Sequence, residues 1–434
     1  MKIKRYSTTF LIVCLVLLAS QFIIVWASSY SRVSAEDYEA LGLPILYIET
    51  EAGKRISSRE NYRNAQFVLK DGENQKSGSC KIRGRGNSTW ETPDTNKKPY
   101  LLKLPEPDSL LGMRTAQKWV LFANAADKSF LRNEYAYYLA SAIWNKCGWV
   151  PQEKAITLVV NGRYEGLYFL GEKISWENLH LPDRSFIACA DSHTAEYWNC
   201  HLKTGMRIGL LRQPDEAENP YNRGEAYLQL VEDMLFSTHF DNPISGYPKY
   251  LDVDSFVDWL LVNEFTKNHD SRFQGSCFMY YNDDTKKIHM GPIWDFDISC
   301  GNIHDAGCDK PDGYIVNTRD WYQKLWQDPA FINRVRSRWF ETRSQTKASI
   351  ELIQQWAKEL APAAELNNRA WKTFGHRQWP NAPGWKKRKT YQSEVDYMVG
   401  YLTARFKWLD EQFSYYTLNW SICEPILLME PLTF

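Results

Sequence analysis

The chain has 434 residues, of which 44% are hydrophobic and 24% are charged. This length suffices for one large hydrophobic core or two of moderate size. Lysine plus arginine and aspartate plus glutamate each number 52, so the formal net charge is zero. A chain without net charge creates no long-range electrostatic field, so the composition argues against nucleic acid as a partner.

The N-terminus combines basic residues with an apolar run, residues 10–27. A run of about 18 residues is long for a signal-peptide core and just sufficient for one membrane crossing. The basic flank predicts that the N-terminus stays inside and the remainder lies outside. We expect residues 1–29 to be a cytoplasmic stub with a hydrophobic signal-anchor helix, in a single-pass membrane protein with an extracytoplasmic domain. The alternative is a signal peptide cleaved near Ala27-Ser28-Ser29 and a secreted protein.

Eight of the nine cysteines follow the apolar run. An even set is what disulfides in an oxidising compartment require, and Cys189/Cys200 and Cys300/Cys308 are the expected local pairs. A zinc site is the alternative, but no two cysteines have CxxC spacing.

Strand patterns dominate the first half of the chain. Residues 30–43 are expected to be a linker, and residues 44–174 are rich in short apolar and alternating runs. Asn161-Gly162 suits the two-residue turn of a hairpin. One helix is predicted over Phe130–Trp144 by its apolar spacing.

The second half is mostly helical. Residues 175–224 are polar and irregular, and we interpret them as a disulfide-stapled insertion. Residues 225–415 have helical periodicity with a central hairpin, whereas residues 416–434 show no clear pattern. Strands followed by helices predict an α+β, two-lobed body with a substrate cleft between the lobes.

The most informative stretch is residues 254–302. A helix precedes Asp270, and two short strands then lead to Asp295 and Asp297. This order predicts two carboxylate positions facing one cleft, as in protein kinases, where one Asp holds the accepting hydroxyl and another holds Mg²⁺. The alternative is that the pair caps a helix and Asp270 begins a turn.

A glycine-rich turn in the first half carries two arginines, Arg83 and Arg85. The turn Gly84–Thr89 could present backbone N–H groups and these arginines to an anion. A plain β-hairpin loop is the alternative.

Together these segments resemble the CotH family of atypical, spore-coat-type protein kinases, over roughly residues 44–415. The segments that carry the resemblance are Arg83–Trp90 (RGRGNSTW), Lys97–Tyr100 with Lys103, Trp119–Asn124, Leu131–Asn133, Asn161–Glu172, Ile293–Asp297 with Gly301-Asn302, and Arg405–Asp410. The resemblance implies a kinase-like fold that binds ATP with Mg²⁺ or Mn²⁺ and phosphorylates serine or threonine hydroxyls of a protein substrate.

The resemblance also implies roles for residues that bind the nucleotide. Lys103 would be the strand lysine that holds the α- and β-phosphates, with Glu134 as its ion-pair partner. Arg83, Arg85 and Lys98 would lie near the phosphates, and the segment containing Glu172 would pass the adenine.

The remaining implied roles concern catalysis and the metal. Asp270 would be the catalytic-loop aspartate, and Asp295, assisted by Asp297, would bind the metal. Where a kinase catalytic loop has its second metal ligand, an Asn, this chain has Gly275, and Gln274 is the possible substitute.

Two other function classes remain open at this point. One is a catalytically silent kinase-like module for assembly of a cell envelope or coat, which an extracytoplasmic site poor in ATP would favour. The other is a carbohydrate-active enzyme that uses the carboxylate pair, with some of the 18 tryptophans stacking on sugars.

Overall fold

The computed structural model describes residues 33–91, 96–191, 198–202, 205–211, 220–273, 275–380 and 382–422. The expected anchor helix lies outside these ranges and stays a prediction. Among the described residues, no helix is both long enough and apolar enough to cross a membrane.

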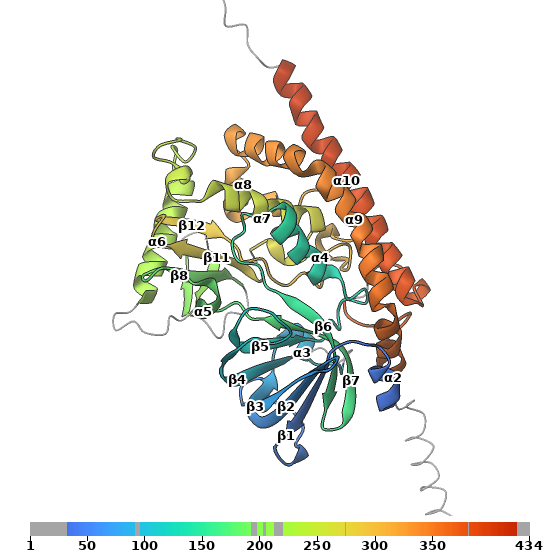
Figure 1. The fold of residues 1–434 in the computed structure, drawn as a ribbon. Coiled ribbons are helices and arrows are strands. Elements are labelled where there is room, and N and C mark those ends of the chain that lie inside the picture. Colours follow the sequence, from blue (N-terminus) through green and yellow to red (C-terminus); the bar gives the residue numbers. More distant parts are fainter. Residues whose placement is uncertain are drawn as a thin grey trace, which may run out of the picture.

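Seven strands of the first half form a closed barrel (Figure 1). In chain order they are β1 (Ile45–Thr50), β2 (Arg63–Asp71), β3 (Asn74–Gly84), β4 (Tyr100–Asp108), β5 (Ala116–Phe122), β6 (Glu153–Val160) and β7 (Arg163–Glu172). All neighbours are antiparallel except β1 and β6, whose parallel pairing closes the barrel. The sequence predicted the strands but not their closure, because the β1–β6 pairing joins segments about a hundred residues apart.

Alternating side chains fill the barrel. Leu46 and Ile48 of β1 pack with Leu102 of β4 and Leu158 of β6 in one buried cluster. The predicted hairpin between β6 and β7 is confirmed, and Asn161 and Gly162 both adopt positive φ there, as a primed two-residue turn requires.

A second, five-stranded sheet has the order β12-β11-β8-β10-β9. Its strands are β8 (Phe186–Ala190), β9 (Trp198–His201), β10 (Arg207–Leu210), β11 (Cys277–Asn282) and β12 (Lys287–Met290). The expectation that residues 175–224 are irregular is therefore wrong. All five residues of β8 are buried, and its partner β11 lies far along the chain, so local patterning gave no sign of the pairing.

The expected disulfides are also not formed. Cys300 and Cys308 are both free and buried, and Cys189 is free in the middle of β8. Burial of each thiol in apolar surroundings raises its pKa and keeps it neutral, so these cysteines pack as small apolar residues. The side chain of Cys200 lies outside the described residues.

Helices make up most of the second half. The helices are α2 (Ala35–Glu39), α3 (Ser88–Glu91), α4 (Arg132–Tyr138), α5 (Trp176–Leu179), α6 (Pro220–Leu235), α7 (Val253–Thr266), α8 (Asp320–Leu325), α9 (Pro329–Trp371) and α10 (Tyr391–Ile422). A π-helical turn, η2 (Leu139–Ile143), continues α4, and short 3₁₀ turns lie at Glu51–Gly53 (η1), Tyr247–Lys249 (η3), His269–Ser271 (η4), Asp305–Gly307 (η5), Val316–Thr318 (η6) and Trp385–Lys387 (η7). The predicted α+β class is thus confirmed.

Helix α9 is one element of 43 residues. Within this helix the Thr346 and Ser349 hydroxyls donate to the Thr342 and Thr346 carbonyls. The C-terminal end of α9 reaches the barrel, where the Trp371 indole donates to the Glu165 carbonyl of β7 (Figure 1). This helix therefore joins the barrel to the helical half.

A buried ion pair holds the helical half together. The Arg405 guanidinium of α10 donates to a Glu264 carboxylate oxygen of α7 at 2.6 Å, and both side chains are at most 1% exposed. Arg405 also donates to the Pro311 and Gly313 carbonyls, while Glu264 accepts from two backbone N–H groups after that loop. Every charge in this contact therefore has several hydrogen-bond partners.

Removing one member of this pair should destabilise the protein strongly. Arg405→Met leaves the Glu264 carboxylate buried without its counter-charge, so we expect the free energy of unfolding to fall by about 3–5 kcal/mol. Urea denaturation measures the loss. The control is Arg343→Met, because Arg343 pairs with Asp410 at the surface, where such pairs contribute up to about 1 kcal/mol. Equal losses in both variants would contradict this account of the helical half.

Candidate active site

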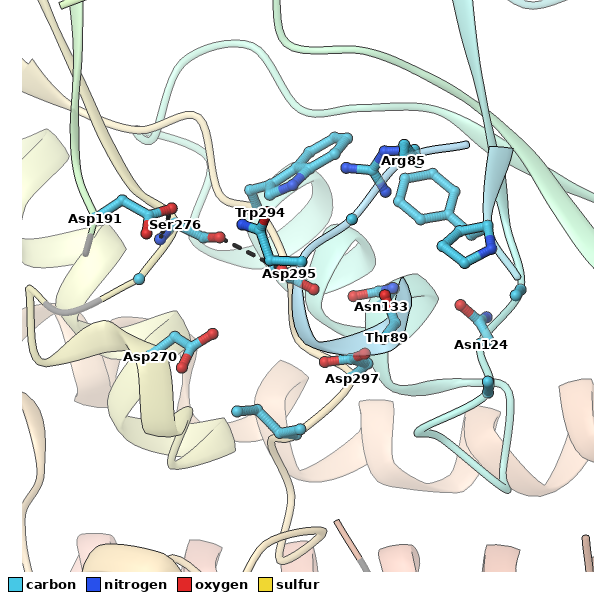
Figure 2. A pocket seen from close by; sticks show the side chains of 18 of the residues that line it. Arg85, Thr89, Asn124, Asn133, Asp191, Asp270, Ser276, Trp294, Asp295 and Asp297 are labelled. Atoms are coloured by element: carbon cyan, nitrogen blue, oxygen red, sulfur yellow. Dashed lines mark hydrogen bonds between the residues drawn. The ribbon is translucent and has the colours of Figure 1, made fainter. Parts of the chain in front are cut away.

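A pocket of about 740 Å³ opens where the barrel meets the second sheet and α4 (Figure 2). Four aspartates line it: Asp191, Asp270, Asp295 and Asp297. Its cationic lining residues include Arg83, Arg85 and Lys173. Segments from both halves of the chain thus meet at one cavity, as the order of motifs predicted.

Asp270 lies in the turn η4, directly after α7. Helix α7 ends at Thr266, and the next residue, Lys267, adopts a left-handed conformation and donates its ammonium to the Gly307 and Lys310 carbonyls. Asn268 then accepts from the Asp270 N–H, and the His269 ring lies 3.2 Å from the Asp270 carboxylate. The Asp270 side chain is 25% exposed, so this carboxylate is held in place yet open to a ligand.

Asp295 and Asp297 lie on a loop that polar side chains fix on both flanks. The Asn133 side-chain oxygen of α4 accepts from the Phe296 N–H at 2.7 Å, and the Asn302 amide donates to the Asp297 carbonyl at 2.6 Å. Asp295 has a φ of 66°, which is uncommon for a non-glycine residue. We interpret this conformation as the means by which two alternate carboxylates both reach the pocket.

The electrostatics of the pocket penalise its own carboxylates. Burial and the neighbouring Asp270 raise the pKa of Asp295 to about 6, while Arg85 acts in the opposite direction. Burial is the largest cause that raises the pKa of Asp297 well above its usual value, and the neighbouring Asp295 and Asp270 add to it. A cation placed among these groups would relieve the repulsion and keep both carboxylates ionised.

The donor set indicates what kind of cation fits. Among the described residues, no three His, Cys, Asp or Glu side chains are close enough to hold a metal ion by themselves. Mg²⁺ is commonly held by one or two carboxylates together with substrate phosphates and water. The pocket therefore suits a divalent metal that arrives with a phosphate ligand better than a closed, all-protein metal site.

Arg85 lines the pocket between two aromatic rings. Its guanidinium lies 5.5 Å from the centre of the Phe122 ring and 5.8 Å from that of Trp294. Arg83 also lines the pocket, but it donates to the Arg59 carbonyl and lies over the Tyr62 ring. The turn predicted to present arginines to an anion thus brings both to the pocket.

Three residues that the resemblance assigned to the nucleotide lie elsewhere. Lys103 follows Leu101 on the same face of β4, but only Leu101 lines the pocket. Lys98 donates to the Trp90 carbonyl at 2.7 Å. Glu172 pairs with Arg114 and accepts from a backbone N–H.

Glu134, the expected ion-pair partner of Lys103, lines a different cavity. The described residues include no ion pair between Glu134 and Lys103. Gln274, the possible metal ligand, lies outside the described residues. The nucleotide roles of Lys103, Lys98, Glu172 and Glu134 stay predictions that this geometry does not support.

Two pocket residues with evident roles were missed by sequence reasoning. Asp191 follows β8 directly, and its carboxylate accepts from the Ser276 N–H at 3.3 Å. No signal marked Asp191, because the strand before it was not recognised. Asn133 lies in Leu131–Asn133, one of the segments that carry the family resemblance, yet nothing in that segment shows that its amide holds the loop of Asp295.

Two comparisons with known proteins bear on this site. A model described as "CotH kinase protein" matches residues 82–409, which is most of the chain and includes the whole pocket apart from Arg59 and Glu60. The chain is also 26% identical over 245 residues to the inner spore coat protein H of Bacillus subtilis (strain 168). That alignment covers 53% of this chain and 62% of the relative, so a large part of the relative is not matched.

The family match spans the barrel from the end of β3, the second sheet and the helices up to α10. It therefore includes every element that contributes one of the four aspartates. On this evidence the chain belongs to the CotH kinase protein family.

Proposed function

We propose that this protein transfers the γ-phosphoryl group of ATP to serine or threonine hydroxyls of a protein substrate, with a divalent metal, in a two-lobed kinase-like fold. The observation that carries the proposal is the convergence of Asp270, Asp295 and Asp297 with Arg85 in one pocket. Phosphoryl transfer needs positioning and charge neutralisation more than covalent catalysis by the protein.

Each carboxylate has a distinct part in this proposal. Asp295 and Asp297, which are buried and carry raised pKa values, would hold Mg²⁺ or Mn²⁺. When bound, the metal supplies positive charge to the phosphate oxygens. Asp270, which is more exposed, would accept the proton of the substrate hydroxyl. At the same time the hydroxyl oxygen bonds to the γ-phosphorus, and the bond between that phosphorus and the ADP oxygen breaks.

In this proposal Arg85 binds the phosphates, a role that sequence reasoning gave mainly to Lys103. It lines the same pocket as the three aspartates, whereas Lys103 does not. A guanidinium binds phosphate oxygens in a planar, two-pronged geometry. The rings of Phe122 and Trp294 beside it would restrict its motion and exclude water.

The setting of the reaction is part of the same proposal. The relative's name places that protein in the inner spore coat. For this chain we propose a location outside the cytoplasm, with the N-terminal apolar segment as an anchor or export signal and a protein of a coat or envelope as the substrate.

A silent binding module is the second candidate. The observation that favours it is that Lys103 lies outside the pocket and forms no ion pair with Glu134 among the described residues. In this version the pocket would bind ATP and metal for assembly without transferring phosphate.

Labelled ATP with Mg²⁺ or Mn²⁺ distinguishes the two candidates. The full chain should label itself or an added acidic protein. Asp295→Asn should weaken metal-dependent ATP binding, whereas Asp270→Asn should leave binding intact and lower transfer about 100-fold or more, as loss of a general base does. Asp283→Asn, in a surface turn, is the control. ATP binding without transfer in the wild type would favour the silent module, and unchanged behaviour of both site variants would refute the site.

Arg85 and Lys103 can be compared directly. Arg85→Met should raise the dissociation constant for ATP by roughly 10- to 100-fold, since a hydrogen bond to a charged group contributes about 1.5–3 kcal/mol. Lys103→Met serves as the matched control and should change it by less than about threefold, because a surface charge contributes little. Calorimetric titration measures both. The opposite ranking would return the phosphate role to Lys103.

The raised pKa of Asp295 predicts how the metal-free protein depends on pH. Folding disfavours the ionised form, so the contribution of Asp295 to stability is fully present below pH 3.8 and is lost as pH rises through about 6. Asp295→Asn removes this loss, and asparagine tolerates positive φ. At pH 8 the variant should be more stable than the wild type by on the order of 2–3 kcal/mol, with little difference near pH 4.

Urea denaturation in the presence of a chelator measures this difference. Asp108→Asn is the control with the opposite sign, because hydrogen bonding to Lys76 lowers the pKa of Asp108. That variant should be less stable than the wild type at neutral pH and approach it as pH falls. A less stable Asp295→Asn variant at pH 8 would contradict the electrostatic account of the pocket.

A further inference from the structure

A second pocket, of about 470 Å³, is lined by α4 and η2, by residues 148–152 and by α9. Its lining residues include Arg114, Glu134, Tyr137, Tyr138, Trp149 and Trp356. None of them lines the pocket of the four aspartates. Its volume is within the usual range for small-ligand sites.

Four aromatic side chains form much of the wall of this pocket: Tyr137, Tyr138, Trp149 and Trp356. Tyr138 and Trp356 pack edge to face, with ring centres 5.5 Å apart. Aromatic faces attract cations, and surrounding a cation with several rings is a recurrent way to bind an ammonium group.

Glu134 adds a negative charge to this aromatic wall. It forms no hydrogen bond and no ion pair with any described residue. Burial raises its pKa, and Glu359 adds to the effect, while Lys154 acts in the opposite direction without an ion pair. Glu134 is partly buried, and a partly desolvated carboxylate without a partner costs free energy that a bound cation would offset.

Two further polar groups of the wall have no partner among the described residues. The Tyr137 hydroxyl is unpaired although the residue is only 5% exposed, and the Trp149 N–H is unpaired and inaccessible. Buried polar groups are paired in the great majority of cases, so two orphans in one small pocket are unusual. Both atoms are inaccessible and an indole N–H can only donate, so these two groups do not identify the charge of a ligand.

The charges that surround this pocket argue against an anion. Among the described residues Arg114 is the one cation that lines it, and its guanidinium is already bound by the Glu172 carboxylate and stacks 4.9 Å from the Trp149 ring. Glu153, whose carboxyl oxygens are inaccessible and unpaired, lies near the same wall, but burial and then Glu134 raise its pKa well above the usual value and favour its neutral form.

We propose that this second pocket binds an alkylammonium group, through Glu134 and the rings of Tyr138, Trp149 and Trp356. Either a lysine side chain of a partner protein or a free di- or polyamine carries this chemistry. The π-helical turn η2 places Ala140 and Ser141 in the wall, and such turns often occur at functional sites. The proposal does not depend on phosphoryl transfer at the first pocket.

Calorimetric titration of the full chain tests the proposal with four compounds. Two are free amines, 1,5-diaminopentane and spermidine, and one is N-acetyl-lysine methylamide, which represents a protein side chain. N-acetyl-norleucine methylamide is the uncharged control of nearly the same shape. We expect at least one amine to bind with an affinity about tenfold or more above that of the norleucine compound, since loss of a charged hydrogen bond costs at least that much.

Substitution then locates the binding. Glu134→Gln should weaken amine binding about tenfold or more, whereas Glu351→Gln, at an exposed position of α9, should leave it unchanged. Glu134→Gln removes a charge that burial disfavours, so the variant should melt at or above the wild-type temperature. Preference for the free amines indicates a polyamine, and preference for the lysine compound indicates a partner protein.

Two results would overturn the proposal. One is that no amine binds to the wild-type protein better than the norleucine compound does. The other is that Glu134→Gln binds amines as well as the wild type does.

Discussion

The site depends on how the N-terminal end of α4 holds the loop that carries Asp295 and Asp297. Arg132 and Asp127 form an ion pair in which each side chain is 1% exposed. Arg132 also donates to the Ser299 carbonyl at 2.9 Å, and the neighbouring Asn133 accepts from the Phe296 N–H. The buried Arg132–Asp127 pair and the Asn133 amide thus join the first half of the chain to both sides of Asp297, and a shift of α4 would move two carboxylates of the pocket.

Helix α4 has a different pocket on each side. Asn133 lines the pocket of the four aspartates, and the next residue, Glu134, lines the aromatic pocket together with Tyr137. Besides Glu153, both Asp295 and Asp297 raise the pKa of Tyr137, whereas Arg85 lowers it. Charges of the aspartate pocket therefore act on Tyr137 in the wall of the aromatic pocket. Because the interior screens charge poorly, such effects are larger here than between surface groups.

Sequence reasoning predicted the α+β class, the turn at Asn161-Gly162 and the convergence of Asp270 with Asp295 and Asp297. These features depend on local patterns or on the order of motifs. It missed the pairing of β8 with β11, which joins segments far apart in the chain and places Asp191 in the pocket. It also assigned disulfides to cysteines that are buried thiols, because an even number of cysteines does not show whether any two side chains approach each other.

The least predictable feature was the role of each cation. Lys97, Arg132 and Arg405 all lie in the segments that carry the family resemblance, yet each is buried and donates to backbone carbonyls, and none lines the pocket. A buried lysine or arginine without such partners would be very costly, so its position fixes the local fold closely. Such residues identify the architecture in a sequence as clearly as catalytic residues identify chemistry. This explains why the resemblance located the carboxylates, which any metal-dependent version of the site requires, but could not tell from sequence which cation, Lys103 or Arg85, lies beside them.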